Sequence, residues 1–268
     1  MDLVPRFKEE HVFIIQGFIV HSVRESGRRG VILGLSGGID SALVARLCAN
    51  ALGPDKVLAL GLPDGKGGAD LRDARRYAKD LGIEFHVVNI GPIASSVEKW
   101  LSATAADAIT RGNLRARIRM LVLYYGANAE DRVVMGTGNK SEILTGYTTK
   151  FGDAAADFLP IGDLYKTQVR EMAKHLGLPP EIMEKPPSAG LWPGQTDEGE
   201  LGISYADLDR VLLGIELQMD PEAISEKARV PLDQVQRVQA LVSASVHKRK
   251  MPLIPKLGVR TVGLDWRE

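Results

Sequence analysis

One stretch, residues 31–41, constrains the fold of this chain more than any other. Val31 to Leu35 is a short, continuous apolar run, typical of a buried parallel strand, and the residues Ser-Gly-Gly-Ile-Asp-Ser follow it directly. A helical pattern then runs from Asp40 to about Leu52. Because two glycines let the backbone turn without a Cβ, successive N–H groups can point at one phosphate beside the helix N-terminus. The stretch therefore predicts a strand, an anion-binding loop and a helix.

Apolar runs and helical patterns alternate along the first half of the chain. Further strands are expected at 56–62, 84–89 and 132–137. Helices are expected at about 7–26, 69–81 and 93–129, the last broken near 111–113. This alternation predicts the α/β class, as a Rossmann-like open parallel sheet flanked by helices.

The pattern changes after residue 137. Two polar stretches with glycine and proline, 146–160 and 186–203, are longer than simple connections, so we expect functional loops there. Helical patterns return near 165–176, 205–218 and 231–247, and an extended tail follows from 252 to 268. We expect a helical C-terminal part within a single domain that spans residues 1–268.

Charge and cysteine content narrow the class of protein. Thirty-four basic residues balance 34 acidic ones, so net charge favours neither nucleic acid nor membrane as a partner. No apolar run reaches the roughly 18 residues that span a bilayer, and the N-terminus lacks a signal-peptide pattern. The single cysteine, Cys48, excludes an intrachain disulfide framework and a cysteine-based zinc cluster. These features predict a cytoplasmic protein.

The loop at 36–41 indicates a particular phosphate chemistry. Asp40 would repel a phosphate unless a cation lay between them, which points to Mg²⁺. The Gly-Lys-Ser/Thr pattern of kinase-like phosphate loops is absent, so transfer of the γ-phosphate is disfavoured. The plain alternative is a helix cap formed by Ser36 or Asp40. A double glycine flanked by two serines and an aspartate is more than a cap requires.

Several later stretches belong to the same pattern. They are residues 113–120, 136–142, 146–153 with Asp157, 164–170, 187–191, 195–198 and 247–249. The loop at 36–41 resembles the fingerprint of the N-type ATP pyrophosphatases, an adenine nucleotide alpha-hydrolase-like superfamily. With the later stretches, the chain is similar to the NAD synthetase family over roughly residues 30–267.

The resemblance implies a reaction and its participants. It implies ATP-dependent amidation of deamido-NAD to NAD through an adenylated nicotinate, with ammonia as nitrogen donor and AMP and pyrophosphate as products. The cofactor would be Mg²⁺, and the assembly a homodimer. Glutamine-using relatives carry an extra amidotransferase domain with a catalytic cysteine, whereas about 30 residues precede the first strand here and Cys48 follows the phosphate loop. Free ammonia is therefore expected; a separate glutaminase subunit stays an alternative.

The resemblance also implies roles for individual residues. Asp40, Glu142 and Lys166 would be catalytic, and Asp40 and Glu142 would hold the metal. The expected ATP contacts are Gly34, Leu35, Ser36, Gly37, Gly38, Ile39, Asp40, Ser41, Thr137, Lys166 and Ser188. The expected deamido-NAD contacts are Arg117, Lys150, Asp157, His247 and Lys248.

Physical reasoning supports some of these roles and leaves others open. Glu142 follows a strand that a parallel sheet would place beside the first, so it can share a cation with Asp40; alone, it could simply favour a helix N-terminus. Lys166 could be an exposed first-turn lysine, although the helix dipole disfavours a cation there. Arg115, Arg117 and Arg119 lie two apart, so one helix cannot direct all three to the same ligand.

Two rival functions have weaker support. A tRNA-modifying thiolase or lysidine enzyme of the same superfamily usually shows a basic face, which a neutral charge balance does not favour. A non-catalytic adenine-nucleotide sensor should have lost a metal carboxylate or the lysine, yet Asp40, Glu142 and Lys166 are all present.

Overall fold

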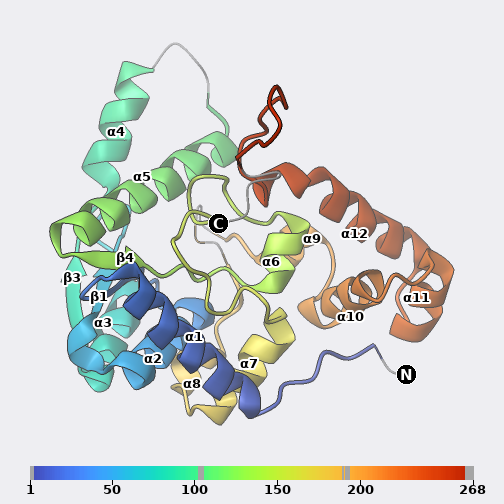
Figure 1. The fold of residues 1–268 in the computed structure, drawn as a ribbon, viewed down its shortest axis with the longest axis horizontal. Helices are drawn as coiled ribbons and strands as arrows, with labels where there is room; N and C mark the ends of the chain where they lie inside the picture. Colours follow the sequence, from blue (N-terminus) through green and yellow to red (C-terminus); the bar gives the residue numbers. More distant parts are fainter. Residues whose placement is uncertain (1–2, 102–105, 189, 191–193, 263–268) are drawn as a thin grey trace.

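The computed structural model describes residues 3–101, 106–188, 190 and 194–262. Its centre is a sheet of four parallel strands in the order β3-β2-β1-β4 (Figure 1). The strands are β1 (Gly30–Gly34), β2 (Val57–Gly61), β3 (Glu84–Val87) and β4 (Arg132–Val134). The two central strands, β1 and β2, are apolar and almost fully buried, as expected where helices cover both faces. The expected α/β class is confirmed.

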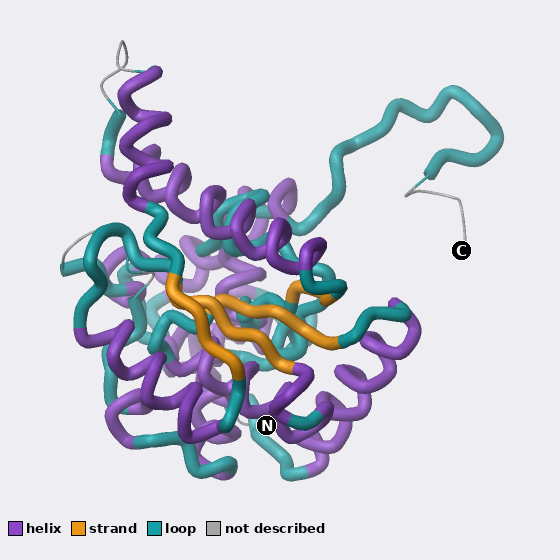
Figure 2. The backbone as a smooth tube through the Cα atoms, turned by 90° about the vertical axis from the view of Figure 1, so that its left-hand side faces the viewer, coloured by secondary structure: helices purple, strands orange, loops and turns teal. Residues whose placement is uncertain are grey.

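Helices cover the sheet on both faces, as Figure 2 shows. On one face α2 (Ile39–Leu52) packs against β1 and β2, with α1 (Glu10–Ser26) outside it and α3 (Ala69–Leu81) beside it. On the other face α5 (Ala108–Ala129) packs against β1 and β4. Alternate residues of β1 serve the two cores: Val31 and Leu33 face the α2 side, and Ile32 faces the α5 side.

The expected helix at 93–129 is two helices, but the break lies elsewhere than predicted. The first, α4 (Gly91–Trp100), ends before residue 101, and α5 begins at Ala108. The Asp107 carboxylate accepts a hydrogen bond from the backbone N–H of Thr110 at 2.7 Å and so caps α5. Gly112 is buried inside that helix. The prediction of a break near 111–113 was wrong, because it weighed the glycine and overlooked the capping aspartate.

The C-terminal part is helical and has its own apolar core. Its helices are α10 (Tyr205–Glu216), α11 (Pro221–Ala228) and α12 (Leu232–Ala244). Their buried side chains form a cluster separate from the cores on the sheet. Shorter helices connect the two parts: α6 (Lys140–Thr145), α7 (Lys166–His175), α8 (Pro180–Met183) and α9 (Asp197–Leu201). The helical C-terminal part is thus confirmed, while the single domain stays a prediction.

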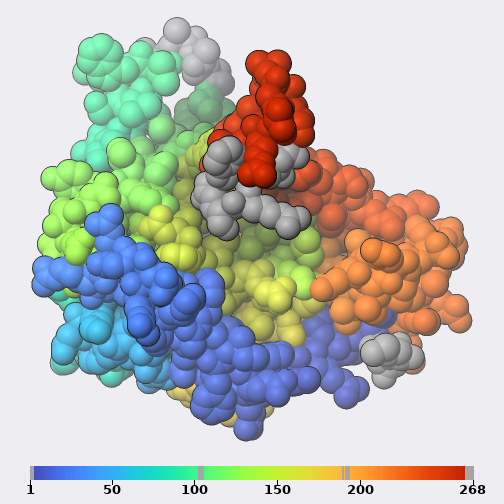
Figure 3. Space-filling view, viewed as in Figure 1, coloured from blue at the N-terminus to red at the C-terminus, as the bar shows by residue number. Residues whose placement is uncertain are grey.

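The described part of the tail, residues 251–262, contains no helix or strand and projects from the body of the molecule (Figure 3). The side chains of Leu253 and Leu257 in it are 85% and 92% exposed.

Cys48 of α2, in contrast, is fully buried. Burial raises the pKa of its thiol to about 12. None of the described helices is long and apolar enough to cross a membrane.

The order in which strands are added to the sheet reverses at one point, beside β1. From β1 the chain proceeds to β2 and β3 on one side, and β4 then lies on the other side of β1. Connections leaving the carboxyl ends of β1 and β4 therefore diverge and open a crevice, where open α/β sheets bind ligands. The crevice is bordered by the loop at 36–41 and by residues 135–138.

Candidate active site

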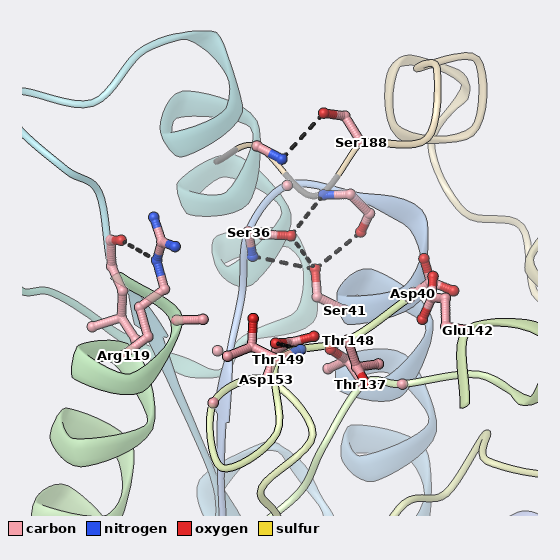
Figure 4. A pocket seen from close by; sticks show the side chains of 18 of the residues that line it. Ser36, Asp40, Ser41, Arg119, Thr137, Glu142, Thr148, Thr149, Asp153 and Ser188 are labelled. Carbon is pink, nitrogen blue, oxygen red and sulfur yellow. Dashed lines mark hydrogen bonds between the residues drawn. The ribbon is translucent and has the colours of Figure 1, made fainter. Parts of the chain in front are cut away.

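A cavity of about 910 Å³ opens at this switch point. Most of the predicted site residues line it: Gly34 to Ser41, Thr137, Glu142, Lys166, Ser188 and Lys248. Figure 4 shows the loop with Ser36 and Ser41 at the centre and the Asp40 and Glu142 carboxylates side by side, although they come from different elements. The structure thus brings together every predicted ATP contact.

The loop at 36–41 is held in shape by its own polar groups. The Ser41 hydroxyl donates to the Gly38 carbonyl at 3.0 Å and accepts from the Ser36 N–H at 3.2 Å. The Ser36 hydroxyl accepts from the Gly38 N–H at 3.2 Å. No side chain caps α2, so neither Ser36 nor Asp40 is the helix cap that was the plain alternative. The loop is a preformed concave backbone with two hydroxyls.

Gly37 shows why this loop needs glycine. Its φ of +85° is in the left-handed region, which residues with a Cβ avoid. A Cβ built there would also overlap the backbone carbonyl oxygen of Asp70, in the first turn of α3. The loop and α3 are therefore in backbone contact.

Lys166 lies at the first position of α7 and is only 2% exposed, so it is not an exposed surface lysine. Its Nζ contacts Asp40 Oδ2 and lies 3.3 Å from Glu142 Oε1. The same ammonium is 5.3 Å from the centroid of the Tyr205 ring. Lys166 thus joins the phosphate loop, the start of α6 and the helical C-terminal part.

Glu142 has the helix-terminus role considered from sequence, and its carboxylate also lies beside that of Asp40 (Figure 4). Its Oε2 accepts from the Asn139 N–H at 3.2 Å, and the Asn139 side chain accepts from the Glu142 N–H at 3.1 Å, a capping box for α6. Asn139 Nδ2 also donates to Asp40 Oδ1 at 3.0 Å. Sequence reasoning did not assign Asn139 a role, although Asn-x-x-Glu is a recognisable capping signal.

The charges of this group are strongly coupled. Burial, reinforced by the neighbouring Asp40 charge, raises the pKa of Glu142 to about 8 against the opposing effect of Lys166. Burial disfavours the charged form of Lys166, but the Asp40 and Glu142 carboxylates outweigh it and raise the pKa of the amine. Two carboxylates therefore converge where a single lysine supplies positive charge, and a further cation would favour the ionised form of both.

The predicted deamido-NAD residues form two groups. Lys248 donates to the carbonyls of Gly146 and Thr148 at 2.6 and 2.7 Å. Lys150 donates to the His247 carbonyl at 2.7 Å, and Arg117 Nε donates to the Lys150 carbonyl at 3.4 Å. Of these, Lys248 alone lines the 910 Å³ cavity, and the other three are linked beside it.

Asp157 lies apart from this group. It lines a second cavity of about 430 Å³ beside the β4 edge of the sheet. Its carboxylate accepts from the Val134 N–H at 2.8 Å and from the Tyr124 hydroxyl at 3.2 Å. Within the described chain, the structure therefore does not bring Asp157 to the ATP loop.

Several lining residues received no role from sequence. Arg119, rather than Arg117, faces the cavity from α5, and its Nε donates to the Leu62 carbonyl at 3.0 Å (Figure 4). Helical spacing showed that three arginines could not share one ligand but could not select among them. Asp197 is 3% exposed and accepts from the Tyr205 hydroxyl at 3.0 Å. Lys185 also lines the cavity, and no sequence signal distinguishes it from other lysines.

Ser188 lies in the polar stretch that was expected to be a functional loop. Its hydroxyl accepts from the Gly190 N–H at 3.1 Å, and the side chain is exposed at the cavity. Residues 189 and 191–193 of this stretch are outside the described residues.

A family model described as NAD synthase matches residues 12–252. The chain belongs to the NAD synthase family. It is 46% identical over 240 residues to the "NH(3)-dependent NAD(+) synthetase" of Pyrococcus furiosus, covering 89% of this chain and 93% of that protein. Identity to the protein of the same name from Pyrococcus horikoshii is 48% over 246 residues, covering 91% and 95%. The resemblance inferred from sequence is confirmed.

Solved structures give the same picture. An NMN synthetase from Francisella tularensis matches with a TM-score of 0.83 at 35% identity, covering 94% of this chain and all of that one. An NH3-dependent NAD synthetase from Campylobacter jejuni, in complex with nitrate, matches with a TM-score of 0.80 at 33% identity, covering 96% and 100%. A glutamine-dependent NAD⁺ synthetase from Acinetobacter baumannii, bound to ADP, matches over only 50% of its length, with a TM-score of 0.68 and 31% identity, covering 98% of this chain.

Proposed function

We propose that this chain amidates deamido-NAD to NAD with ATP and ammonia, releasing AMP and pyrophosphate. The observation that carries the proposal is the meeting of Lys166, Asp40 and Glu142 at the phosphate loop, in a chain of the NAD synthase family. The nicotinate carboxylate of deamido-NAD would attack the α-phosphorus of ATP, forming an adenylate and expelling pyrophosphate. Ammonia would then attack the activated carbonyl and displace AMP.

Different residues of the cavity would bind the phosphates and stabilise the charge that develops in these steps. A carboxylate is already nucleophilic, so catalysis rests on positioning and on stabilising charge as pyrophosphate leaves. The backbone N–H groups and hydroxyls of 36–41 would hold the phosphates, with Thr137 and Ser188 as further ATP contacts. Lys166, buried and fixed at the start of α7, would place its ammonium against the leaving pyrophosphate.

Asp40 and Glu142 fit a magnesium ion. Their carboxylates lie close enough together to contact the same Lys166 ammonium, and they offer the hard oxygen ligands that Mg²⁺ takes from proteins alongside phosphate and water. Among the described residues no group of three or more acidic, histidine or cysteine ligands forms a self-sufficient metal site. Bound there, Mg²⁺ would neutralise phosphate charge, which the pair of carboxylates alone cannot do.

For deamido-NAD we propose the linked group of Arg117, Lys150, His247 and Lys248, together with Asp157. Since Asp157 lines the separate cavity at the β4 edge, its role requires a substrate or a partner subunit that reaches that edge. We therefore propose a homodimer through this face. We also propose a cytoplasmic location for the enzyme.

Exposed apolar side chains support the dimer. Phe13 of α1 and Tyr125 of α5 are 74% and 75% exposed, and both helices contribute to the second cavity at β4. Replacing both with lysine should convert a dimer into a monomer in sedimentation. A parent protein that sediments as a monomer would contradict the proposal.

Purified protein tests the reaction directly. With ATP, Mg²⁺, deamido-NAD and ammonium it should form NAD and AMP in equal amounts, and glutamine should not replace ammonium. ADP as product, or a rate indifferent to deamido-NAD, would overturn the assignment.

A second candidate substrate is the nicotinate mononucleotide, because an NMN synthetase is among the solved structures similar to this chain. It carries the same carboxylate without the adenylate half. Competition between equal concentrations of the mononucleotide and deamido-NAD decides between them: NAD should be the main product.

A further inference from the structure

Lys185 links three parts of the cavity that are distant in sequence. It follows α8 and lies three residues before Ser188. Its Nζ donates to the Gly37 carbonyl at 3.2 Å and to Asp70 Oδ1 at 2.8 Å, and it is 2.6 Å from Asp73 Oδ2. One ammonium thus joins the phosphate loop, the first two turns of α3 and the base of the stretch that contains Ser188.

The contacts of Lys185 indicate support for the loop rather than direct phosphate binding. An ammonium has three N–H donors, and here each has an acceptor. Two of those acceptors are carboxylates, so the charge of Lys185 is already balanced. Lys166 is likewise paired with two carboxylates, so what sets Lys185 apart is its third contact, with a backbone carbonyl of the phosphate loop itself.

The Gly37 carbonyl is the important acceptor. Gly37 has φ +85°, and the peptide that follows it carries the N–H of Gly38. Because a peptide is planar, fixing the carbonyl of Gly37 also fixes the direction of that N–H. If the peptide rotated, the carbonyl oxygen could face a bound phosphate and repel it. The contact with Lys185 holds this oxygen toward α3 instead.

We propose that Lys185 is a positioning residue that keeps the phosphate loop in its anion-binding shape and anchors the Ser188 stretch to it. The proposal rests on the proposed ATP-dependent function. It concerns the binding of ATP, so it can be tested separately from NAD formation.

The test compares Lys185→Met with Arg76→Met. Arg76 also joins α3 to α8, through Glu181, and pairs with Asp73 of its own helix at 3.7 Å, but within the described chain it makes no hydrogen bond or ion pair with residues 36–41. Binding of Mg–ATP is measured by calorimetry, and the KM of each substrate by initial rates. Lys185→Met should weaken ATP binding and raise the KM for ATP by about tenfold, the effect of losing a charged hydrogen bond, with the KM for ammonium unchanged.

Each other outcome has a clear meaning. Equal effects of the two variants on ATP binding, or parent-like binding by Lys185→Met, would overturn the proposal. A parent protein that binds ATP but makes no NAD would instead contradict the proposed reaction and leave this test intact.

A second variant separates support from direct binding. Replacing Asp70 and Asp73 with asparagine leaves Lys185 without charged partners. If Lys185 supports the loop, ATP binding should weaken because the ammonium loses its anchor. If Lys185 is a phosphate ligand, freeing it should strengthen ATP binding, and the proposal fails. Circular dichroism and thermal unfolding establish that each variant is folded.

Discussion

The two sides of the cavity are built in different ways. The sheet side follows directly from the carboxyl ends of the buried strands β1 and β4 and consists of residues 34–41 and 135–138. Hydrogen bonds between residues close in sequence fix the shape of its phosphate loop. The helical side is lined by Lys166, Asp197 and Lys248, with Tyr205 buried behind them. It depends on contacts across long stretches of chain, such as the one between Lys166 and Asp40, 126 positions apart.

The difference separates two tasks. Backbone groups on a rigid strand end can hold phosphates common to any ATP-using enzyme. Side chains from several helices can select and activate the second substrate, and they need the whole fold in order to meet. Substitutions on the sheet side should therefore weaken ATP binding. Substitutions on the helical side should act more through the stability of the fold and through the reaction steps that follow ATP binding.

The largest effect is expected at Asp40, the residue through which the two sides meet. Asp40→Asn removes a contact of Lys166 and a ligand of the proposed metal site. We expect kcat to fall by about 10²–10³-fold, as for loss of a main group that stabilises transition-state charge. Initial rates of NAD formation at saturating ATP and Mg²⁺ measure it.

Asp163→Asn is the control, because Asp163 is 96% exposed and pairs with Lys140 away from the cavity lining. A rate for Asp40→Asn close to that of the control would mean that the trio with Lys166 and Glu142 is structural.

A smaller effect, limited to ATP, is expected on the sheet side alone. Gly37→Ala introduces a left-handed alanine and an overlap with the Asp70 carbonyl. The displaced loop should raise the KM for ATP by up to about 10²-fold, the scale of a shift of about 1 Å in a positioned group.

Gly53→Ala provides a matched control. Gly53 has a φ of +87°, but nothing lies within 4 Å of an added Cβ. Both variants should lose about 1–2 kcal/mol of stability through the left-handed backbone, but only Gly37→Ala should raise the KM for ATP. If the two variants have equal KM values for ATP, the backbone contact with α3 does not matter for binding.

The smallest of the three effects is expected on the helical side. Tyr205→Phe keeps the ring beside Lys166 but removes the hydroxyl that donates to the buried carboxylate of Asp197. Stability should fall by about 1–3 kcal/mol, since a buried acceptor is left without its donor. Thermal unfolding measures this, with the 75% exposed Tyr125 changed to Phe as control.

The KM for ATP should stay unchanged in Tyr205→Phe. A fall in kcat as large as that of Asp40→Asn would contradict the assignment of different tasks to the sheet side and the helical side of the cavity.

The same contrast explains what could be predicted from sequence. Strand, loop and helix at 31–52 are local patterns, and periodicity placed them correctly. The meeting of Asp40 with Glu142 followed from parallel strands whose carboxyl ends share one edge. For Lys166 the helix dipole gave only a local indication, so family resemblance was needed to assign its role.

Other features required the folded chain. Arg119 faces the cavity because of how α5 is rotated on the sheet, which the spacing of three arginines does not determine. Lys185 acquires its partners only when the segment that follows α8 comes to lie against α3. The helix break was misplaced because a glycine seemed a stronger signal than the capping Asp107.

The burial of Cys48 has a consequence for the redox chemistry of this protein. It is the chain's single cysteine, and its thiol, with a pKa of about 12 in the folded state, carries almost no thiolate near neutral pH. Since the thiolate is the form that oxidants and alkylating agents attack, the folded enzyme should be inert to both. Reaction requires α2 to leave the core, so modification of Cys48 would record unfolding behind the phosphate loop rather than regulate activity.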